Sequence, residues 1–289
     1  MTTEARIADV AFSRYDGPRS GRLAAIWSLA HWSALRALGA RRSWKAKVIP
    51  VALTLLAFSP ALVILGIRAL FAGSTLAHDA STELPYSDYT SAISVVILVY
   101  SVILIPELVC PDRRDRTLSL YFSTAIGPSD YVIGKILAAV LPLCALTLLP
   151  PLLLYVGNVL FAVHPVGYLE NHLADPLRII GGGLTIAVTY GLVGLAISSL
   201  TSRRAFAVGG YLAFLAIPTI IGGVLAHALN ERYLRLLAFA AAPQQTSRGL
   251  YPGYTDRGNI SAWVWASVSV ELIVVAIAVL AIRYGRDEG

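Results

Sequence analysis

The sequence predicts an all-α integral membrane protein with six transmembrane helices. Of its 289 residues, 56% are hydrophobic and only 14% are charged, and the mean hydropathy is +0.68. Soluble domains carry about a quarter charged residues, so this chain has too few for a water-soluble surface. The apolar residues also form runs of about 20 residues, the length that crosses roughly 30 Å of hydrocarbon in a bilayer.

The N-terminal segment, residues 1–47, is basic and precedes the first apolar run. Within it, apolar residues such as Leu23, Ile26 and Trp27 recur at helical spacing over 22–40. Tryptophans and a basic end suit an amphipathic helix that lies on the inner membrane surface, although the pattern also fits a plain extension of the first span. A cleaved signal peptide is not expected, because no compact apolar core ends in a small-residue cleavage site.

Six apolar runs within residues 48–289 are the candidate membrane spans, and they cover 48–71, 91–110, 132–162, 178–200, 205–229 and 261–283. The third run is longer than a span requires and contains Pro150 and Pro151, so we expect a kink or a break there. In the fourth run, Gly183, Ala187 and Gly191 recur every four residues, which predicts a face for close helix packing.

The basic residues set the expected orientation. Lys and Arg occur before the first span, in the 111–131 linker, in the 201–204 turn and in the C-terminal tail, whereas 72–90 and 163–177 contain none. By the positive-inside rule, both termini and the 111–131 linker are therefore cytoplasmic, and the protein lies in the cell membrane. The outer stretch 230–260 is the exception, because it carries four arginines.

The outer stretch 230–260 is long for a loop and has apolar residues, among them Tyr233, Leu237 and Phe239. Trp263 follows it and marks the outer interface of the sixth span. We expect this stretch to form a half-inserted or a surface-lying helix.

The linker between the second and third spans is amphipathic. Five charged residues open it, from Asp112 to Arg116, and an apolar set at helical spacing follows: Leu118, Tyr121, Phe122, Ala125 and Ile126. Asp112 can start a helix, where a carboxylate favours the positive end of the helix dipole, and Gly127-Pro128 can end it. The pattern predicts a short helix over 112–126 whose apolar face is available to a cytosolic partner. A solvated loop is the alternative.

The linker also contains a recognisable series of motifs. It reads Asp112-Arg113, then Thr117-Leu118, Gly127-Pro128 and Tyr131-Val132-Ile133-Gly134-Lys135. This series resembles the region between the second and third spans of ABC exporter permeases of the type-2 class. Those permeases usually have Glu, Gly and Pro where this chain has Asp112, Arg116 and Ala125.

The resemblance implies that 112–126 is a coupling helix, which docks on a separate ATP-hydrolysing subunit. The residues implied for this docking are Asp112, Arg113, Arg114, Arg116, Thr117, Leu118, Tyr121, Phe122 and Lys135. It further implies a complex of two permease copies, identical or paralogous, with two ATPase subunits that bind MgATP. The expected partners are thus ATPase subunits, a second permease and membrane lipid.

Several kinds of chemistry have no support in the sequence. Gly134-Lys135 is not a phosphate-binding loop, because that motif needs Gly at the position of Ser129 and Ser or Thr at that of Ile136. The five histidines lack metal-ligand spacing, and no catalytic constellation occurs. The net charge of +6 comes from basic residues beside spans, so no nucleic-acid partner is expected. We therefore expect a transport subunit without enzymatic activity, metal or cofactor of its own.

Two acidic residues fall inside predicted spans. Glu271 lies near the middle of the sixth span, where it either lines a substrate pathway, binds a cation or makes a structural polar contact to another span. Glu107 lies near the end of the second span, where an ion pair with Arg113 or Arg114 is expected. An alternative function follows from Glu271: an ion-coupled secondary transporter or a channel in which this residue carries the coupling ion.

Overall fold

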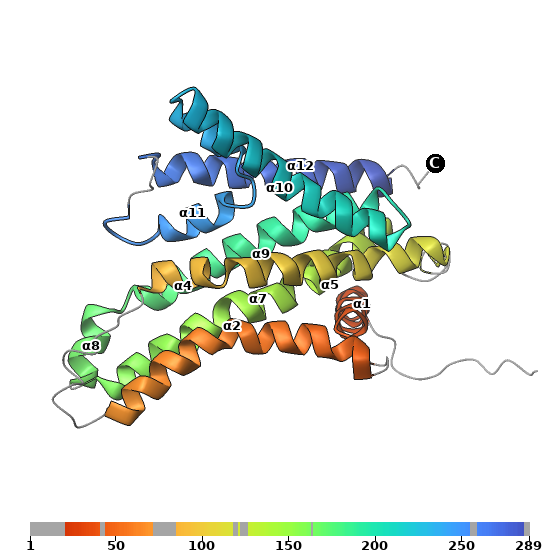
Figure 1. Ribbon diagram of the computed structural model, residues 1–289. Helices are drawn as coiled ribbons and strands as arrows, with labels where there is room; N and C mark the ends of the chain where they lie inside the picture. The colour runs from red at the N-terminus through yellow and green to blue at the C-terminus, as the bar shows by residue number, and fades with distance from the viewer. Residues whose placement is uncertain are drawn as a thin grey trace, which may run out of the picture.

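The structure is a computed structural model that describes residues 21–40, 44–71, 85–117, 121, 127–162, 164–254 and 259–285. Its described elements are all helices, and most of them run side by side in one elongated bundle (Figure 1). Within this part of the chain, six helices are long and apolar enough to cross a membrane. They are α2 (Trp44–Phe71), α5 (Ser94–Arg114), α7 (Pro128–Phe161), α9 (Asp175–Ser199), α10 (Arg204–Ala228) and α12 (Ala262–Gly285). Each coincides with a predicted span, and the helix ends differ from the predicted ones by at most four residues.

Helix α9 lies at the centre of the bundle and is the most buried of the six spans. It contacts α5, α7, α10 and α12. Gly183 and Gly191 of α9 are closely approached by Leu148 and Val140 of α7, and a side chain at either glycine would collide with them or crowd them. The small-residue face predicted in this span therefore packs closely on α7.

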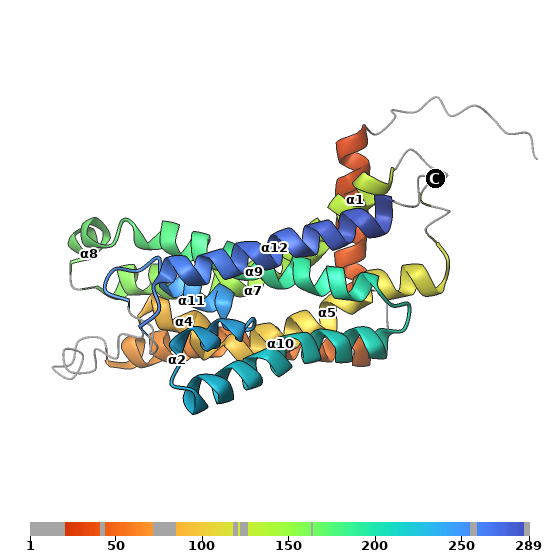
Figure 2. The ribbon, with the colours of Figure 1, turned by 90° about the horizontal axis from the view of Figure 1, so that it is seen from above.

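A shorter helix, α1 (Arg22–Ala37), crosses one end of the bundle transverse to the long helices (Figure 2). Its buried side packs on α7, where Gly134 leaves room for Leu29. Trp27 and Trp32 remain about half exposed on α1. The N-terminal helix expected from the sequence is thus present, with one side on the bundle and two tryptophans at its surface.

The third span does not break at its prolines. Helix α7 runs from Pro128 to Phe161 without interruption, and both Pro150 and Pro151 are buried in it. One turn earlier, Thr147 Oγ1 donates a 3.0 Å hydrogen bond to the backbone oxygen of Gly183 on α9. Membrane helices tolerate proline where neighbouring helices and hydroxyl groups support the freed backbone groups, so packing against α9 accounts for the continuity.

The described residues of the stretch 230–260, 230–254 and 259–260, fold back onto the long helices. They form a 3-10 helix, η1 (Arg232–Leu237), which packs on α10, and α11 (Ala242–Arg248), which packs on both α9 and α12. Between them, the backbone oxygen of Ala240 accepts a 2.5 Å hydrogen bond from the Tyr190 hydroxyl of α9. The described part of this stretch is thus helical and packed on the long helices, and its depth in a membrane stays a prediction.

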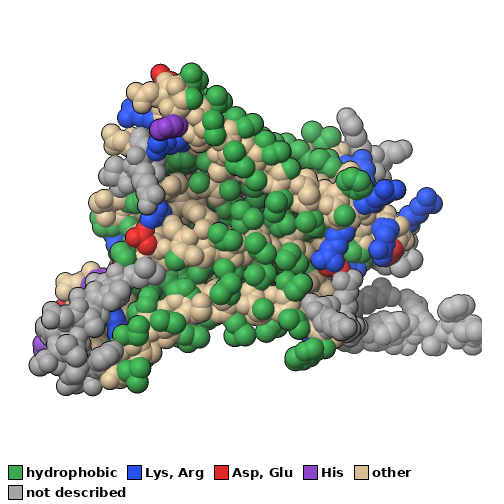
Figure 3. Space-filling view, in the orientation of Figure 1, with side chains coloured by type: hydrophobic (Ala, Val, Ile, Leu, Met, Phe, Trp, Pro, Cys, Tyr) green, Lys and Arg blue, Asp and Glu red, His purple; other side chains and the backbone are tan. Residues whose placement is uncertain are grey.

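The two ends of the bundle differ in charge. Figure 3 shows Lys and Arg side chains gathered at the end where α1 lies, and a broad apolar band between the two ends. We call the end formed by α1, the last turn of α5 and the first turns of α7 the basic end. The opposite end carries the short helices α4 (Tyr86–Ala92) and α8 (Pro165–Asn171). There, Arg248 of α11 is neutralised by an ion pair with Asp88 of α4.

Helix α5 ends later than the sequence indicates. Asp112 does not start a new helix, because α5 continues through Arg114 and holds Asp112 in its last turn. The Thr117 N–H then donates a 3.0 Å hydrogen bond to the Asp112 oxygen, and Arg116 has a φ of 53°. This is the left-handed residue that commonly ends a helix. Of the remaining predicted helix only Tyr121 is described, and it is helical; residues 118–120 and 122–126 lie outside the described residues.

Arg116→Gly should stabilise the protein. A residue with a side chain costs roughly 1–2 kcal/mol in the left-handed region, and substitution by glycine removes this cost. The greater flexibility of glycine in the unfolded chain reduces the resulting stabilisation by about 0.5–1 kcal/mol. We expect a small rise in the thermal unfolding midpoint, followed by tryptophan fluorescence in detergent. Arg114→Gly is the control, because the same change within helical backbone should lower the midpoint. A lower midpoint for both variants would contradict the left-handed turn.

Candidate functional site

Buried charges join three helices at the basic end. Asp112 of α5 and Lys135 of α7 are only 1% and 2% exposed, and Lys135 Nζ lies 2.7 Å from Asp112 Oδ2. An unpaired charge costs several kcal/mol in a protein interior, so each residue requires the other. We call Asp112, Lys135 and the three side chains that bond to them, Ser33, Arg36 and Tyr131, the Asp112 cluster.

Each proton of the Lys135 ammonium has a partner. Nζ donates to Ser33 Oγ and to the backbone oxygen of Leu108, both at 2.9 Å, and the third partner is Asp112. An ammonium has three donors, so this group is satisfied by the protein alone. Ser33 belongs to α1, and Leu108 and Asp112 belong to α5. One side chain of α7 therefore holds both neighbouring helices.

The Asp112 carboxylate accepts two further hydrogen bonds. Arg36 Nη2 of α1 lies 2.7 Å from Oδ1, and the Tyr131 hydroxyl lies 3.1 Å from Oδ2. Partial burial lowers the pKa of Arg36, but the charge and the hydrogen bond of Asp112 together raise it, and the net pKa is above its ordinary value. Arg36 thus stays protonated, and a single carboxylate compensates two cations.

Tyrosine rings cover the cluster. The ring centroid of Tyr131 lies 5.5 Å from that of Tyr284 on α12 and 5.6 Å from that of Tyr121 in the linker. Burial, and then the charge of Asp112, raise the pKa of Tyr121, so its hydroxyl remains neutral. The rings extend the contact of the cluster to α12 and to the linker.

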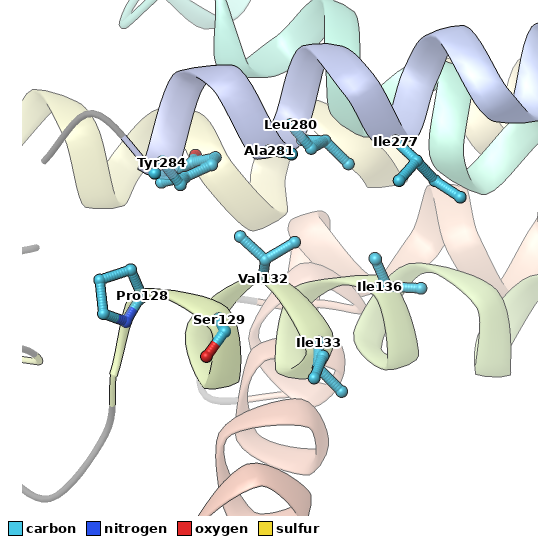
Figure 4. Close-up of a pocket in the computed structure, with 10 residues that line it drawn as sticks. Pro128, Ser129, Val132, Ile133, Ile136, Ile277, Leu280, Ala281 and Tyr284 are labelled. Atoms are coloured by element: carbon cyan, nitrogen blue, oxygen red, sulfur yellow. The ribbon is translucent and has the colours of Figure 1, made fainter. Parts of the chain in front are cut away.

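An apolar groove opens beside this tyrosine layer, between the first turns of α7 and the last turns of α12 (Figure 4). Its volume is about 390 Å³. Val132 and Ile136 line it from α7, and Ile277, Leu280 and Tyr284 line it from α12. Because its walls are almost entirely hydrocarbon, the groove suits an apolar side chain or an acyl chain better than a polar ligand.

Of the other residues predicted to dock an ATPase, the structure describes Arg113, Arg114, Arg116 and Thr117, whereas Leu118 and Phe122 lie outside the described residues. Arg114 pairs on the surface with its neighbour Asp115 at 2.8 Å. Thr117 Oγ1 donates a 3.2 Å hydrogen bond to the backbone oxygen of Asp112. The start of the linker is therefore bonded to the cluster through Thr117.

Glu107 forms an ion pair with a partner that the sequence did not indicate. Arg204 Nη1, at the start of α10, lies 2.9 Å from Glu107 Oε2, whereas we expected Arg113 or Arg114. The Glu107 side chain is almost fully buried and that of Arg204 is half exposed, and the pair links the end of α5 to the start of α10.

Glu271 lies on the exposed side of α12. At 1.5 Å per residue it is about 14 Å from Ala262 and about 21 Å from Gly285, close to the middle of the helix. Within the described residues it forms no ion pair or hydrogen bond. A polar contact to another span of the same chain, one of the expected alternatives, is therefore not made by this part of the chain.

The sequence gives no sign that Ser33 and Arg36 belong to the site. They lie one turn apart on α1, and Arg36 is 76 residues from Asp112 along the chain. The one feature of the sequence that points to this site is Lys135, because a lysine inside an apolar run requires a nearby acid. That reasoning leads to Asp112, but not to the donors that α1 supplies.

Comparison with known proteins adds no further constraint. The chain matches no protein-family profile and no curated protein sequence. Within the described residues, no three His, Cys, Asp or Glu side chains are placed to hold a metal ion. The site is therefore interpreted from its own geometry.

Lys135→Met should destabilise the protein strongly. It removes one partner of a buried pair, which typically costs about 3–5 kcal/mol. Asp112→Asn combined with Lys135→Met removes both charges, so we expect the double variant to lose less than the sum of the single losses, by about 1 kcal/mol or more. The measurement is unfolding in detergent micelles, analysed as a double-mutant cycle.

The control is the same cycle at the exposed pair, with Arg114→Met and Asp115→Asn. Solvent screens that pair, so its coupling should be close to zero. Additive losses at Asp112 and Lys135 would show that the two residues do not depend on each other.

Proposed function

We propose that this chain is the membrane-spanning permease subunit of an ATP-driven ABC transporter, and that it acts in export. The observation that carries the proposal is the Asp112 cluster. Asp112 precedes the linker that resembles a coupling helix, Lys135 follows it, and the two bond directly to each other at 2.7 Å. A segment that transmits force must be rigidly joined to the helices it moves, and a satisfied buried ion pair is such a joint.

In this proposal the protein lies in the cell membrane with its basic end toward the cytoplasm. Both termini are then cytoplasmic. The concentration of Lys and Arg at that end supports this orientation (Figure 3). The exposed Trp27 and Trp32 suit the membrane interface, which supports α1 as an interfacial helix.

The proposal assigns ATP hydrolysis to separate subunits. The chain has no phosphate-binding loop of the Walker A type, so MgATP belongs to ATPase subunits that dock on the coupling segment 112–126. A second permease, identical or paralogous, completes the complex within membrane lipid. This chain then has no enzymatic activity of its own and no nucleic-acid partner.

Closure of the ATPase dimer would push on 112–126. Asp112 lies in the last turn of α5 and Lys135 in the second turn of α7, so both helices receive the push together. Ser33 and Arg36 pass it to α1, and the Glu107–Arg204 pair passes it to α10. The cytoplasmic ends of four helices would then tilt as one unit and reshape a cavity between the two permeases.

The alternative, an ion-coupled transporter or a channel, has one specific support, the position of Glu271 near the middle of α12. Such transporters usually build their ion sites from several polar groups and broken helices. Helix α12 is continuous, and Glu271 has no charged partner within the described residues. This alternative also leaves the Asp112 cluster without a role.

Leu118→Glu combined with Phe122→Glu should release the ATPase subunit. The two carboxylates would have to be buried in the docking interface, and a loss of about 1.4 kcal/mol already lowers binding about tenfold. We expect at least that decrease in the ATPase that co-purifies with a tagged permease, while the permease remains inserted in the membrane.

The matched control is Val166→Glu combined with Leu169→Glu, which makes the same chemical change on two exposed residues of α8 at the opposite end. Co-purification should be unchanged in this control. Equal ATPase binding and equal transport-coupled hydrolysis in both double variants would rule out docking at 112–126.

A further inference from the structure

Glu271 puts a carboxylate on the surface that lipid would otherwise cover. It is exposed and lies about 14 Å from the nearer end of α12. A glutamate side chain is too short to reach the membrane interface from that depth, and a charged residue in contact with hydrocarbon there is strongly unfavourable. This side of α12 is therefore unsuited to contact with hydrocarbon.

A line of mostly short side chains runs along the same side of α12. Its members alternate in steps of four and three residues, and all are exposed: Ser267, Glu271, Val274, Ala278, Ala281 and Gly285. This spacing is the one by which two helices pack side by side, and short side chains permit close approach in membranes. The buried residues of α12, such as Trp265, Ala276 and Leu280, face the bundle instead. We call the six exposed residues the Glu271 face.

The apolar groove continues the Glu271 face toward the basic end. Ala281 and Gly285 belong to the face and also line the groove between α7 and α12. Figure 4 shows Ala281 on the α12 side of the groove. A helix on the face would thus find an acid near mid-span and an apolar recess nearer the basic end.

The charge of the face determines its partner. Ionisable groups inside membranes generally pair with one another, so an acid at mid-span calls for a base at the same depth. Lys135 is buried in the Asp112 cluster, and the other Lys and Arg residues of the six long helices lie within three residues of a helix end. Within the six described spans of a second copy, therefore, no base lies at the depth of Glu271.

We infer that the Glu271 face binds a membrane-spanning helix of a different protein chain, which carries a Lys or Arg near the middle of its span. The resulting ion pair neutralises Glu271, and the short side chains bring the two backbones close together. The inference uses only α12, so it holds whether or not an ATPase drives the protein.

Photocrosslinking in the membranes of cells that naturally produce the protein tests this. A photoreactive phenylalanine at Val274 or Ala278 should form an adduct with another chain, whose span contains a Lys or Arg. At Val63, an exposed position on α2, the same probe serves as the control. Glu271→Gln should lower the adduct yield about tenfold, the effect of losing about 1.4 kcal/mol. Glu170→Gln, a matched change outside the spans, should leave the yield unaltered.

Exchange of charges separates a specific partner from a neighbour. Glu271→Lys should abolish the adduct, and a Glu in place of the partner's base should restore it in the same cells. An adduct between two differently tagged copies of this chain would overturn the inference, as would labelling of lipid alone or no adduct at either position. An adduct that persists in Glu271→Gln would also overturn it.

Discussion

Asp112 and Lys135 can remain ionised inside the bundle only because each completes the bonding of the other. The pair need not add net stability, since well-packed apolar residues often replace a buried ion pair without loss. Its stronger effect is geometric: Lys135 reaches Ser33 and Leu108 only when α1, α5 and α7 stand in one relative position. The rest of the basic end depends on that register, including the tyrosine layer and the exit of the linker from α5.

Charges elsewhere in the described fold follow the depth at which they lie. The pairs Glu107–Arg204 and Asp88–Arg248 join elements near the two ends of the bundle. Between the ends, helices are joined by hydrogen bonds between uncharged groups. For example, the Tyr211 hydroxyl donates to the backbone oxygen of Tyr190 at 2.9 Å. This division reflects the rising cost of charge toward the middle of a membrane. Glu271 departs from it, and for that reason its exposed position is informative.

The six spans were predictable because hydropathy is a local property of the chain, and so was the amphipathic N-terminal helix. An error arose where tertiary contacts overrode a local rule: Lys135 with Arg36 keeps Asp112 inside α5 instead of at the start of a new helix. Of the kink or break expected near Pro150, the break does not occur, because α7 packs against α9 there. Asp112 and Lys135 were expected to matter from their motif, and a lysine in an apolar run already points to Asp112, but no pattern along the chain indicates Ser33 or Arg36 of α1. Tertiary pairing of this kind has no sequence period.

The turn after α5 places a residue with a long side chain in a backbone conformation that favours glycine. Arg116 has a φ of 53°, a region that glycine enters freely and arginine does not. Arg116 tolerates it because the turn is held from both sides. Thr117 donates to the Asp112 oxygen through its N–H and its hydroxyl, and the Asp112 side chain is fixed by Lys135. The cluster therefore sets the direction in which the linker leaves the bundle, whichever residue occupies the turn. If 112–126 docks on a separate subunit, as proposed, it requires a fixed direction of this kind, because a flexible exit would absorb the displacement that it has to transmit.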